Sequence, residues 1–280
     1  MEGVHERTLF LFTDDGDMAI RASQFTRVHA VQVDRNLANE FQADQDYDTY
    51  GYWKLVQVRV QAIVNIMKAD IPILICEPDA LWVKSPLKDP ALTTGTADLV
   101  GFDDNSGVPG FGFLRVRTTA GVKALFDEME RRYSSQMPQN PPPLTSAFNP
   151  GAGEQDILHG LIADRQSKPW KDLQFQMLPG TKYASGKWYD GGRGGDGKAE
   201  RENARKEGVP FVINNNWIVG NQPKIVRAKR WGHWFLQDDT AGTCKDVAKL
   251  NSQIQEMQKT MESLQPMHGP PKPGECPKCR

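Results

Sequence analysis

Short apolar runs alternate with helical patterns through the first half of the chain, and this alternation constrains the fold more than any other feature. Five runs have the length of buried strands, at residues 8–13, 28–33, 71–76, 98–103 and 110–117. Residues 53–69 and 119–133 instead place apolar side chains at helical spacing on one face. Strands that alternate with helices predict a layered α/β fold with a mixed, mostly parallel central sheet flanked by helices.

A pair of carboxylates follows the most apolar of these runs. We expect residues 71–76 to form a central strand covered on both faces, with Glu77-Pro78-Asp79 directly after it. Open α/β sheets bind ligands beyond the carboxyl ends of their strands. In extended backbone, residues two apart lie roughly 6–7 Å apart on one face, so both carboxylates would face one cation. Such oxygen ligands favour Mg²⁺ or Mn²⁺. A Pro-Asp turn that only ends the strand is the alternative.

The second half of the chain predicts long loops around a few regular elements. Residues 138–153 and 190–208 are rich in Pro or Gly and are expected to be loops, either lids over a site or segments without a role. Between them, Glu154 opens a helix with acidic residues in its first turn. Residues 211–219 resume strand character, and residues 231–236 supply an aromatic edge.

The end of the chain predicts one more helix and a tail. Residues 244–264 place apolar side chains at alternating spacings of three and four, which is an a/d seam. We expect this helix to pack back on the domain, with a homodimer through residues 247–264 as the alternative. The predicted organisation is therefore a domain over residues 1–236, then a helix and a tail rich in Pro, Gly and Cys over 237–280.

Composition excludes several classes of protein. The 280 residues are 39% hydrophobic and 25% charged, which is ordinary globular usage. A net charge of −1 creates no overall field toward nucleic acid, so no nucleic-acid partner is expected. No stretch approaches the ~18 uncharged apolar residues of a membrane span, and the first residues lack the pattern of a signal peptide.

Five blocks of sequence stand in an order known from one family. They are Glu77-Pro78-Asp79 with Trp82 behind it, Gly110-Phe-Gly-Phe113, Glu154-Gln155-Asp156, Tyr183-Ala-Ser-Gly186, and Asn214-Asn215-Asn216-Trp217-Ile218-Val219-Gly220 followed by Lys224. Together they resemble the Asp-x-Asp, Asn-Thr-Gly-Phe, Asp-Gln-Asp, Phe-x-Asn-Gly and His-Asn-Asn-Trp-Ile-x-Gly motifs of the nucleotide-diphospho-sugar transferase domain. This domain defines a group of retaining GT-A glycosyltransferases that includes family 77. The resemblance runs over about residues 8–236 and implies a GT-A type fold.

The resemblance implies roles for eleven residues. Glu77 and Asp79 would hold Mn²⁺ or Mg²⁺ and the diphosphate of a nucleotide sugar. The residues expected to bind substrate are Arg59, Gly112, Asn214, Asn216, Gly220 and Lys224. Those expected to line the pocket near the anomeric carbon are Glu154, Gln155 and Asp156. A retaining enzyme needs either a carboxylate nucleophile, here Glu154 or Asp156, or front-side attack with Gln155 stabilising charge; both routes stay open.

Simpler explanations exist for several of these residues. Arg59 would otherwise be a snorkelling surface arginine, Lys224 an ordinary exposed lysine, and the carboxylates near Glu154 an acidic helix start. Trp217 and Trp234 are expected to be core aromatics rather than sugar platforms.

The implied function is a metal-dependent glycosyltransferase that uses a UDP-sugar and a glycan, protein or small-molecule acceptor. The alternative is a catalytically degenerate or truncated member that binds a nucleotide, a sugar or a protein. It rests on four departures from the family's Asp, Asn, Asp and His, at Glu77, Gly110, Glu154 and Asn214, and on a first family strand expected to be missing. A third hypothesis is an unrelated scaffold assembled through the C-terminal seam. The family implies the Golgi lumen, although no signal or anchor is visible in the sequence.

Overall fold

The computed structural model describes residues 9–13, 28–32, 47–103, 107–190 and 197–234, together with residues 252, 253, 255–257, 259 and 263. The chain forms two compact units. The first comprises Met1–Leu74, Leu87–Val100 and Arg115–Gln176, and the second comprises Ile75–Pro86, Gly101–Leu114 and Met177–Arg280. The described elements form a mixed α/β fold, which confirms the predicted fold class. In the described part of the chain, no helix combines the length and apolarity that crossing a membrane requires.

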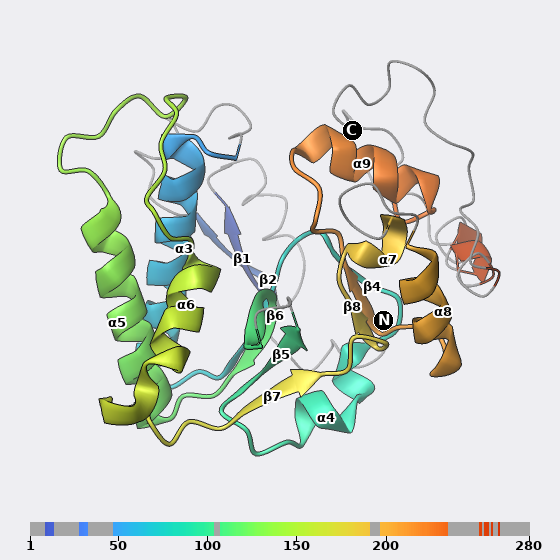
Figure 1. The fold of residues 1–280 in the computed structure, drawn as a ribbon, viewed down its shortest axis with the longest axis horizontal. Helices are drawn as coiled ribbons and strands as arrows, with labels where there is room; N and C mark the ends of the chain where they lie inside the picture. Colours follow the sequence, from blue (N-terminus) through green and yellow to red (C-terminus); the bar gives the residue numbers. More distant parts are fainter. Residues whose placement is uncertain are drawn as a thin grey trace. The chain divides into compact units, whose positions relative to one another are not determined.

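Among the described residues of the first unit, the helical layer contains α3 (Tyr50–Lys68), α5 (Ala120–Gln136) and α6 (Glu154–Ala163). Helix α5 packs against both α3 and α6 (Figure 1). Thr49 begins α3, because its side chain accepts a hydrogen bond from the amide of Tyr52 at 3.3 Å. The apolar stripes predicted for α3 and α5 are the buried faces of these helices, so their predicted periodicity is confirmed.

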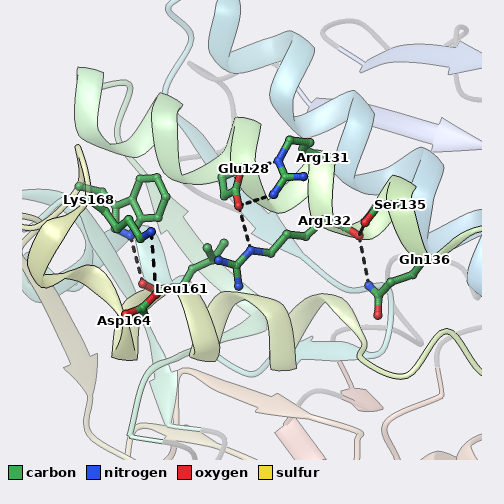
Figure 2. Close-up of polar contacts among 9 residues, drawn as sticks. Glu128, Arg131, Arg132, Ser135, Gln136, Leu161, Asp164 and Lys168 are labelled. Atoms are coloured by element: carbon green, nitrogen blue, oxygen red, sulfur yellow. Dashed lines mark hydrogen bonds and ion pairs between the residues drawn. The ribbon is translucent and has the colours of Figure 1, made fainter.

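Figure 2 shows polar contacts among side chains of α5 and of the segment that follows α6. On α5, Glu128 accepts hydrogen bonds from Arg131 and Arg132 one turn further along, at 2.7–2.9 Å. Beyond α6, the indole of Trp170 donates to the carbonyl of Leu161 at 3.0 Å, which satisfies a carbonyl of the last turn of α6.

The strands in the described part of the chain form three sheets. Strands β1 (Leu9–Thr13) and β2 (Val28–Gln32) pair in parallel, at the positions predicted for the first two strands. A four-stranded sheet has the order β3 (Ile73–Cys76), β6 (Pro109–Val116), β5 (Leu99–Asp103) and β7 (Phe175–Leu178). Strand β3 is an edge of this sheet and its first three residues are half-buried, so the expected central strand covered on both faces is not found among the described residues. The buried strands are β5 and β6.

The second unit contains the third sheet, in which β9 (Val212–Asn214) lies between β4 (Ala80–Trp82) and β8 (Tyr183–Ala184). Strand β9 is antiparallel to β4 and parallel to β8. The described part of this unit also contains the helices α7 (Lys187–Asp190), α8 (Lys198–Lys206) and α9 (Asn221–Arg230). Elsewhere, α4 (Pro90–Thr93) and two 3₁₀ turns, Pro86–Lys88 and Arg165–Ser167, complete the described elements.

The sequence predicted the loops and helices of the second half only in part. Residues 138–153 form the expected loop, and α6 begins at Glu154 as predicted. The expected loop over residues 190–208 is wrong, because α8 occupies its second part and buries Arg201 and Ala204. The strand expected over residues 211–219 ends at Asn214. Of the aromatic edge expected over residues 231–236, the structure describes 231–234, where residues 231–232 form a turn and none is in a strand.

Aromatic side chains dominate the core of the second unit. Trp188 and Trp231 meet edge to face, with ring centroids 5.0 Å apart. Met257 joins this cluster with 1% of its surface exposed, so this helical position near the C-terminus contributes to the core. The amide of Gln253 donates to the carbonyls of Gly232 and Trp234 at 2.5 and 2.7 Å. The rest of the helix predicted over residues 244–264 lies outside the described residues, as does the Cys276-x-x-Cys279 tail.

Candidate functional site

The Glu77-Pro78-Asp79 segment forms a β-turn at the carboxyl end of β3. The amide of Ala80 donates to the carbonyl of Glu77 at 3.0 Å, and the amide of Glu77 donates to the carbonyl of Gly112 on β6 at 2.9 Å. Proline stands at the second turn position, where its fixed φ suits the bend. The extended geometry expected for this segment is therefore wrong, whereas its place directly after the strand is confirmed.

The side chain of Glu77 meets Asn214, which ends β9. Asn214 pairs with Ala80 across the β4–β9 ladder, and this pairing brings it to the turn. Its Nδ2 lies 3.4 Å from Oε2 of Glu77, and only 2% of the residue is exposed. Gly112 makes the approach possible. A Cβ at this position would lie 2.4 Å from Nδ2 of Asn214 and 2.5 Å from Oε2 of Glu77, so a side chain has no room here.

The other carboxylate of the turn, Asp79, forms an ion pair with Lys224. Nζ of Lys224, in the first turn of α9, lies 2.6 Å from Oδ2 of Asp79. Asn215 connects the turn after β3 to α9. Its backbone amide donates to the carbonyl of Asp79 at 3.0 Å, and its side-chain Nδ2 donates to the carbonyl of Lys224 at 3.1 Å. Lys224 is thus not the ordinary exposed lysine of the simpler explanation.

Arg227 holds the loop that joins β9 to α9. Arg227 was not among the residues predicted from the sequence. This residue is 6% exposed. It donates to Oδ1 of Asn215 at 2.7 Å, to the carbonyl of Asn216 at 2.5 Å, and to Oδ2 of Asp190 at 3.1 Å. The spacing of Lys224 and Arg227 is that of neighbours on one helical face, but no helix was expected there, so no signal singled out Arg227.

The other predicted residues of this loop shape its backbone. Oδ1 of Asn216 accepts a hydrogen bond from the amide of Gly186 at 2.6 Å. Gly220, with a φ of 91°, adopts a conformation that favours glycine just before α9 begins. Trp217 was expected in the core, and this is wrong: it is 37% exposed. Trp234 is half-buried.

Four predicted residues lie in the first unit, where they form a cluster of their own. Glu154, in the first turn of α6, forms an ion pair with Arg59 of α3. Oδ2 of Asp156 accepts from the amide of Gly153 at 3.1 Å, which stabilises the start of α6. Gln155 is half-buried in the same turn. Arg59 is therefore not a snorkelling surface residue, while the acidic helix start accounts for the position of Asp156.

The polar residues of the second unit offer oxygen atoms of the kind that divalent cations prefer. The described residues contain no group of three or more His, Cys, Asp and Glu side chains suited to a metal. Glu77 and Asp79 nevertheless offer two carboxylates, and Asn214 offers a third oxygen. Oδ1 of Asn214 is buried and accepts no hydrogen bond from the described part of the chain. Mg²⁺ and Mn²⁺ accept one or two carboxylates from a protein and keep their other positions for water and phosphate.

These features define an α/β protein in which acidic and basic side chains meet at the carboxyl end of a strand, a common place for ligands in α/β sheets. The comparison with protein families makes the class specific. The chain belongs to the nucleotide-diphospho-sugar transferase family, whose sequence model matches residues 4–227. Membership indicates a glycosyltransferase that uses a nucleotide-sugar donor and an acceptor. Searches of curated proteins and of solved structures each gave no significant match.

Proposed function

We propose that the protein is a glycosyltransferase that depends on a divalent cation, Mn²⁺ or Mg²⁺. In this proposal it transfers a sugar from a UDP-sugar to a glycan, protein or small-molecule acceptor with retention of configuration. The observation that supports the proposal most is the turn after β3, where Asp79 meets Lys224 and Glu77 meets Asn214. A diphosphate carries several negative charges, and this turn combines oxygen ligands for a cation with an ammonium group for the phosphate.

Lys224 is proposed to stabilise the leaving group. When the bond between the sugar and the β-phosphate breaks, negative charge develops on the phosphate oxygens. Groups already placed where charge develops lower the barrier most, because they need little reorganisation. Nζ of Lys224 is already close to the site, where Asp79 holds it. A bound cation would supply further positive charge to the diphosphate. Glu77, Asp79 and Asn214 would hold it, leaving the Lys224 ammonium to contact the phosphate.

The contacts of the first unit favour one of the two routes to retention. Glu154 already pairs with Arg59, and Asp156 already accepts the hydrogen bond of the helix start. Each contact already occupies one oxygen of a carboxylate that would otherwise have to attack the anomeric carbon. We therefore favour front-side attack with Gln155 stabilising positive charge near the anomeric carbon, and with Glu154 and Arg59 positioning that turn. Capture of a covalent sugar adduct on Glu154 or Asp156 would contradict this choice.

The Asp79–Lys224 ion pair also supports the alternative function. A lysine can neutralise an aspartate without any metal, and the family histidine is replaced by Asn214. A member of this kind would bind a nucleotide, a sugar or a protein without turnover. Turnover of any UDP-sugar that a chelator abolishes would exclude it.

Thermal unfolding with UDP, with and without Mn²⁺, tests the proposal. A ligand at about 100 times its dissociation constant stabilises a protein by roughly 2.7 kcal/mol. For a chain of this size, that corresponds to a shift on the order of 5–10 °C. We expect a shift that needs Mn²⁺, disappears with EDTA, and is lost in Asp79→Asn. Asp164→Asn is the matched control, because Asp164 is 72% exposed and pairs only distantly with Lys168.

The possible outcomes separate the two functions. A Mn²⁺-dependent shift, followed by release of UDP from a UDP-sugar, supports the transferase. A shift without release of UDP from any UDP-sugar supports the binding module. Absence of a UDP shift at saturating Mn²⁺, or an equal shift in wild type and Asp79→Asn, contradicts the proposed site.

A further inference from the structure

Trp217 is exposed in a backbone conformation that large side chains rarely adopt. Its φ is 62°, in the left-handed region, where Cβ crowds the neighbouring carbonyl. The indole is nevertheless 37% exposed rather than buried in the core. Holding an aromatic residue outward in this way loses both conformational energy and the gain of burial. Strain of this kind persists only where the surroundings impose it, and it is concentrated at functional sites.

The contacts just before Trp217 impose this conformation. The carbonyl of Asn216 accepts a hydrogen bond from the buried guanidinium of Arg227, and the Asn216 side chain accepts one from the amide of Gly186. Gly186 is essential to this packing, because a Cβ there would lie 1.9 Å from the carbonyl oxygen of Asn216. The residue that precedes Trp217 is therefore fixed from both sides, and the indole is presented by a held loop.

Lys187 stands beside the indole. Its Nζ lies 4.4 Å from the centroid of the Trp217 ring, within the range of a cation–π interaction. Lys187 begins α7, so its main chain is part of a regular element next to Gly186. The pair thus combines an exposed aromatic face with an ammonium group that donates hydrogen bonds. Val219, two residues further along the same loop, is 66% exposed.

The loop also joins the two contacts of the proposed donor site. It follows Asn214, which contacts Glu77, and it leads to Lys224, which contacts Asp79. We propose that Trp217 and Lys187 form a binding platform for a sugar ring of the acceptor. The inference rests on the proposed function and narrows its acceptor to a saccharide. The apolar C–H face of a sugar ring would stack on the indole, and its hydroxyl oxygens would accept hydrogen bonds from Lys187.

The test measures the binding of defined saccharides separately from the binding of UDP. Wild type, Trp217→Ala and Trp217→Phe are applied to an array of neutral and acidic oligosaccharides. The UDP-dependent thermal shift is recorded for each protein. We expect wild type to bind at least one saccharide, Trp217→Ala to bind it at least about tenfold more weakly, and Trp217→Phe to stay within about threefold. All three should keep the UDP shift. Tyr47→Ala is the matched control, because Tyr47 is another exposed aromatic residue, at 49%.

Three outcomes overturn the inference. Absence of saccharide binding by wild type, or equal binding by Trp217→Ala, removes the platform. Loss of the UDP shift in Trp217→Ala, with saccharide binding kept, assigns the indole to the nucleotide base instead. The two proposals fail independently. A UDP shift without Trp217-dependent saccharide binding leaves the transferase proposal intact. Trp217-dependent saccharide binding without a UDP shift leaves only the platform.

Discussion

At the scale of single residues, Gly112 shows how a missing side chain shapes the candidate site. Its Cα faces the contact between Glu77 and Asn214, which leaves no space for even a methyl group. In the sequence, Gly112 is expected to contact substrate, and this stays a prediction. In the structure, the absence of a Cβ at Gly112 lets a carboxylate and an amide approach each other.

Gly112→Ala should therefore separate Glu77 from Asn214. Overpacking of this kind typically costs 1–3 kcal/mol, so we expect a loss of about 2 kcal/mol in the free energy of unfolding, together with a weakened Mn²⁺-dependent UDP shift. Urea denaturation and the UDP thermal shift measure the two effects. Gly160→Ala is the control: nothing lies within 4 Å of a Cβ there, within α6. It should stabilise the protein by roughly 0.5–1 kcal/mol. Equal effects of the two substitutions would contradict this account.

At the scale of elements, the helices divide into those with a clear local pattern and those without one. Helices α3 and α5 carry regular apolar stripes, and both were predicted. Helix α9 carries four basic residues among its ten, and α8 is similarly polar. Their buried positions include Arg201 and Arg227, whose guanidinium groups bond to carbonyl and side-chain oxygens within the unit. A pattern that counts only apolar residues misses a helix whose inward face contains arginine.

Helix α5 allows a prediction about pH. Hydrogen bonds from Arg131, and then from Arg132, lower the pKa of Glu128 from 4.5 to about 2 (Figure 2). A lowered carboxyl pKa stabilises the folded state above the unfolded value of 4.5, and this stabilisation is lost as the pH falls toward 2. We expect Glu128→Gln to lower the free energy of unfolding at pH 7 by less than about 1 kcal/mol, since such pairs are screened by solvent.

Chemical denaturation of wild type and Glu128→Gln at pH 7 and pH 3.5 checks this expectation. The difference between the two proteins should be smaller at pH 3.5. Asp127→Asn is a suitable control, because the Lys68–Asp127 pair spans 3.6 Å between side chains that are more than half exposed. A difference for Glu128→Gln that does not change with pH would contradict the ion-pair explanation.

At the scale of the whole molecule, stability should depend on a histidine buried in the second unit. Nδ1 of His233 lies 2.7 Å from the hydroxyl of Tyr189, and its ring stacks on Trp188. Burial raises the pKa of Tyr189, so the hydroxyl keeps its proton and shares a hydrogen bond with Nδ1 of His233. Burial also lowers the pKa of His233 from 6.5 to about 3. The folded protein therefore keeps this histidine neutral at pH values where the unfolded chain protonates it.

This difference predicts that acid destabilises the protein through His233. Since the unfolded chain binds the extra proton, the stabilisation is present above pH 6.5 and falls as the pH drops toward 3. Between pH 7.5 and 5.5, wild type should lose about 1 kcal/mol more than His233→Phe in the free energy of unfolding. His233→Phe should be less stable at both values, because the Tyr189 hydroxyl loses its partner. Denaturant titrations at the two pH values measure the slope, and parallel slopes would exclude His233 as the source.

The sequence by itself determined the features that depend on neighbouring residues. Local patterns predicted four of these features: the apolar stripes of α3 and α5, the loop at residues 138–153, the start of α6 at Glu154, and the position of Glu77 and Asp79 after β3. The family was likewise recognisable from short blocks in order, and the match over residues 4–227 confirms it.

Only the tertiary structure decided which of these residues meet. Asp79 pairs with Lys224 across 145 positions, Glu77 meets Asn214 across 137, and Arg59 meets Glu154 across 95. It also decided that Trp217 is held outward. A periodic pattern records which side of an element is apolar, but not which distant element covers that side. Contacts between charged groups far apart in the chain depend on strand register and helix packing, and these are fixed by the summed burial of many residues.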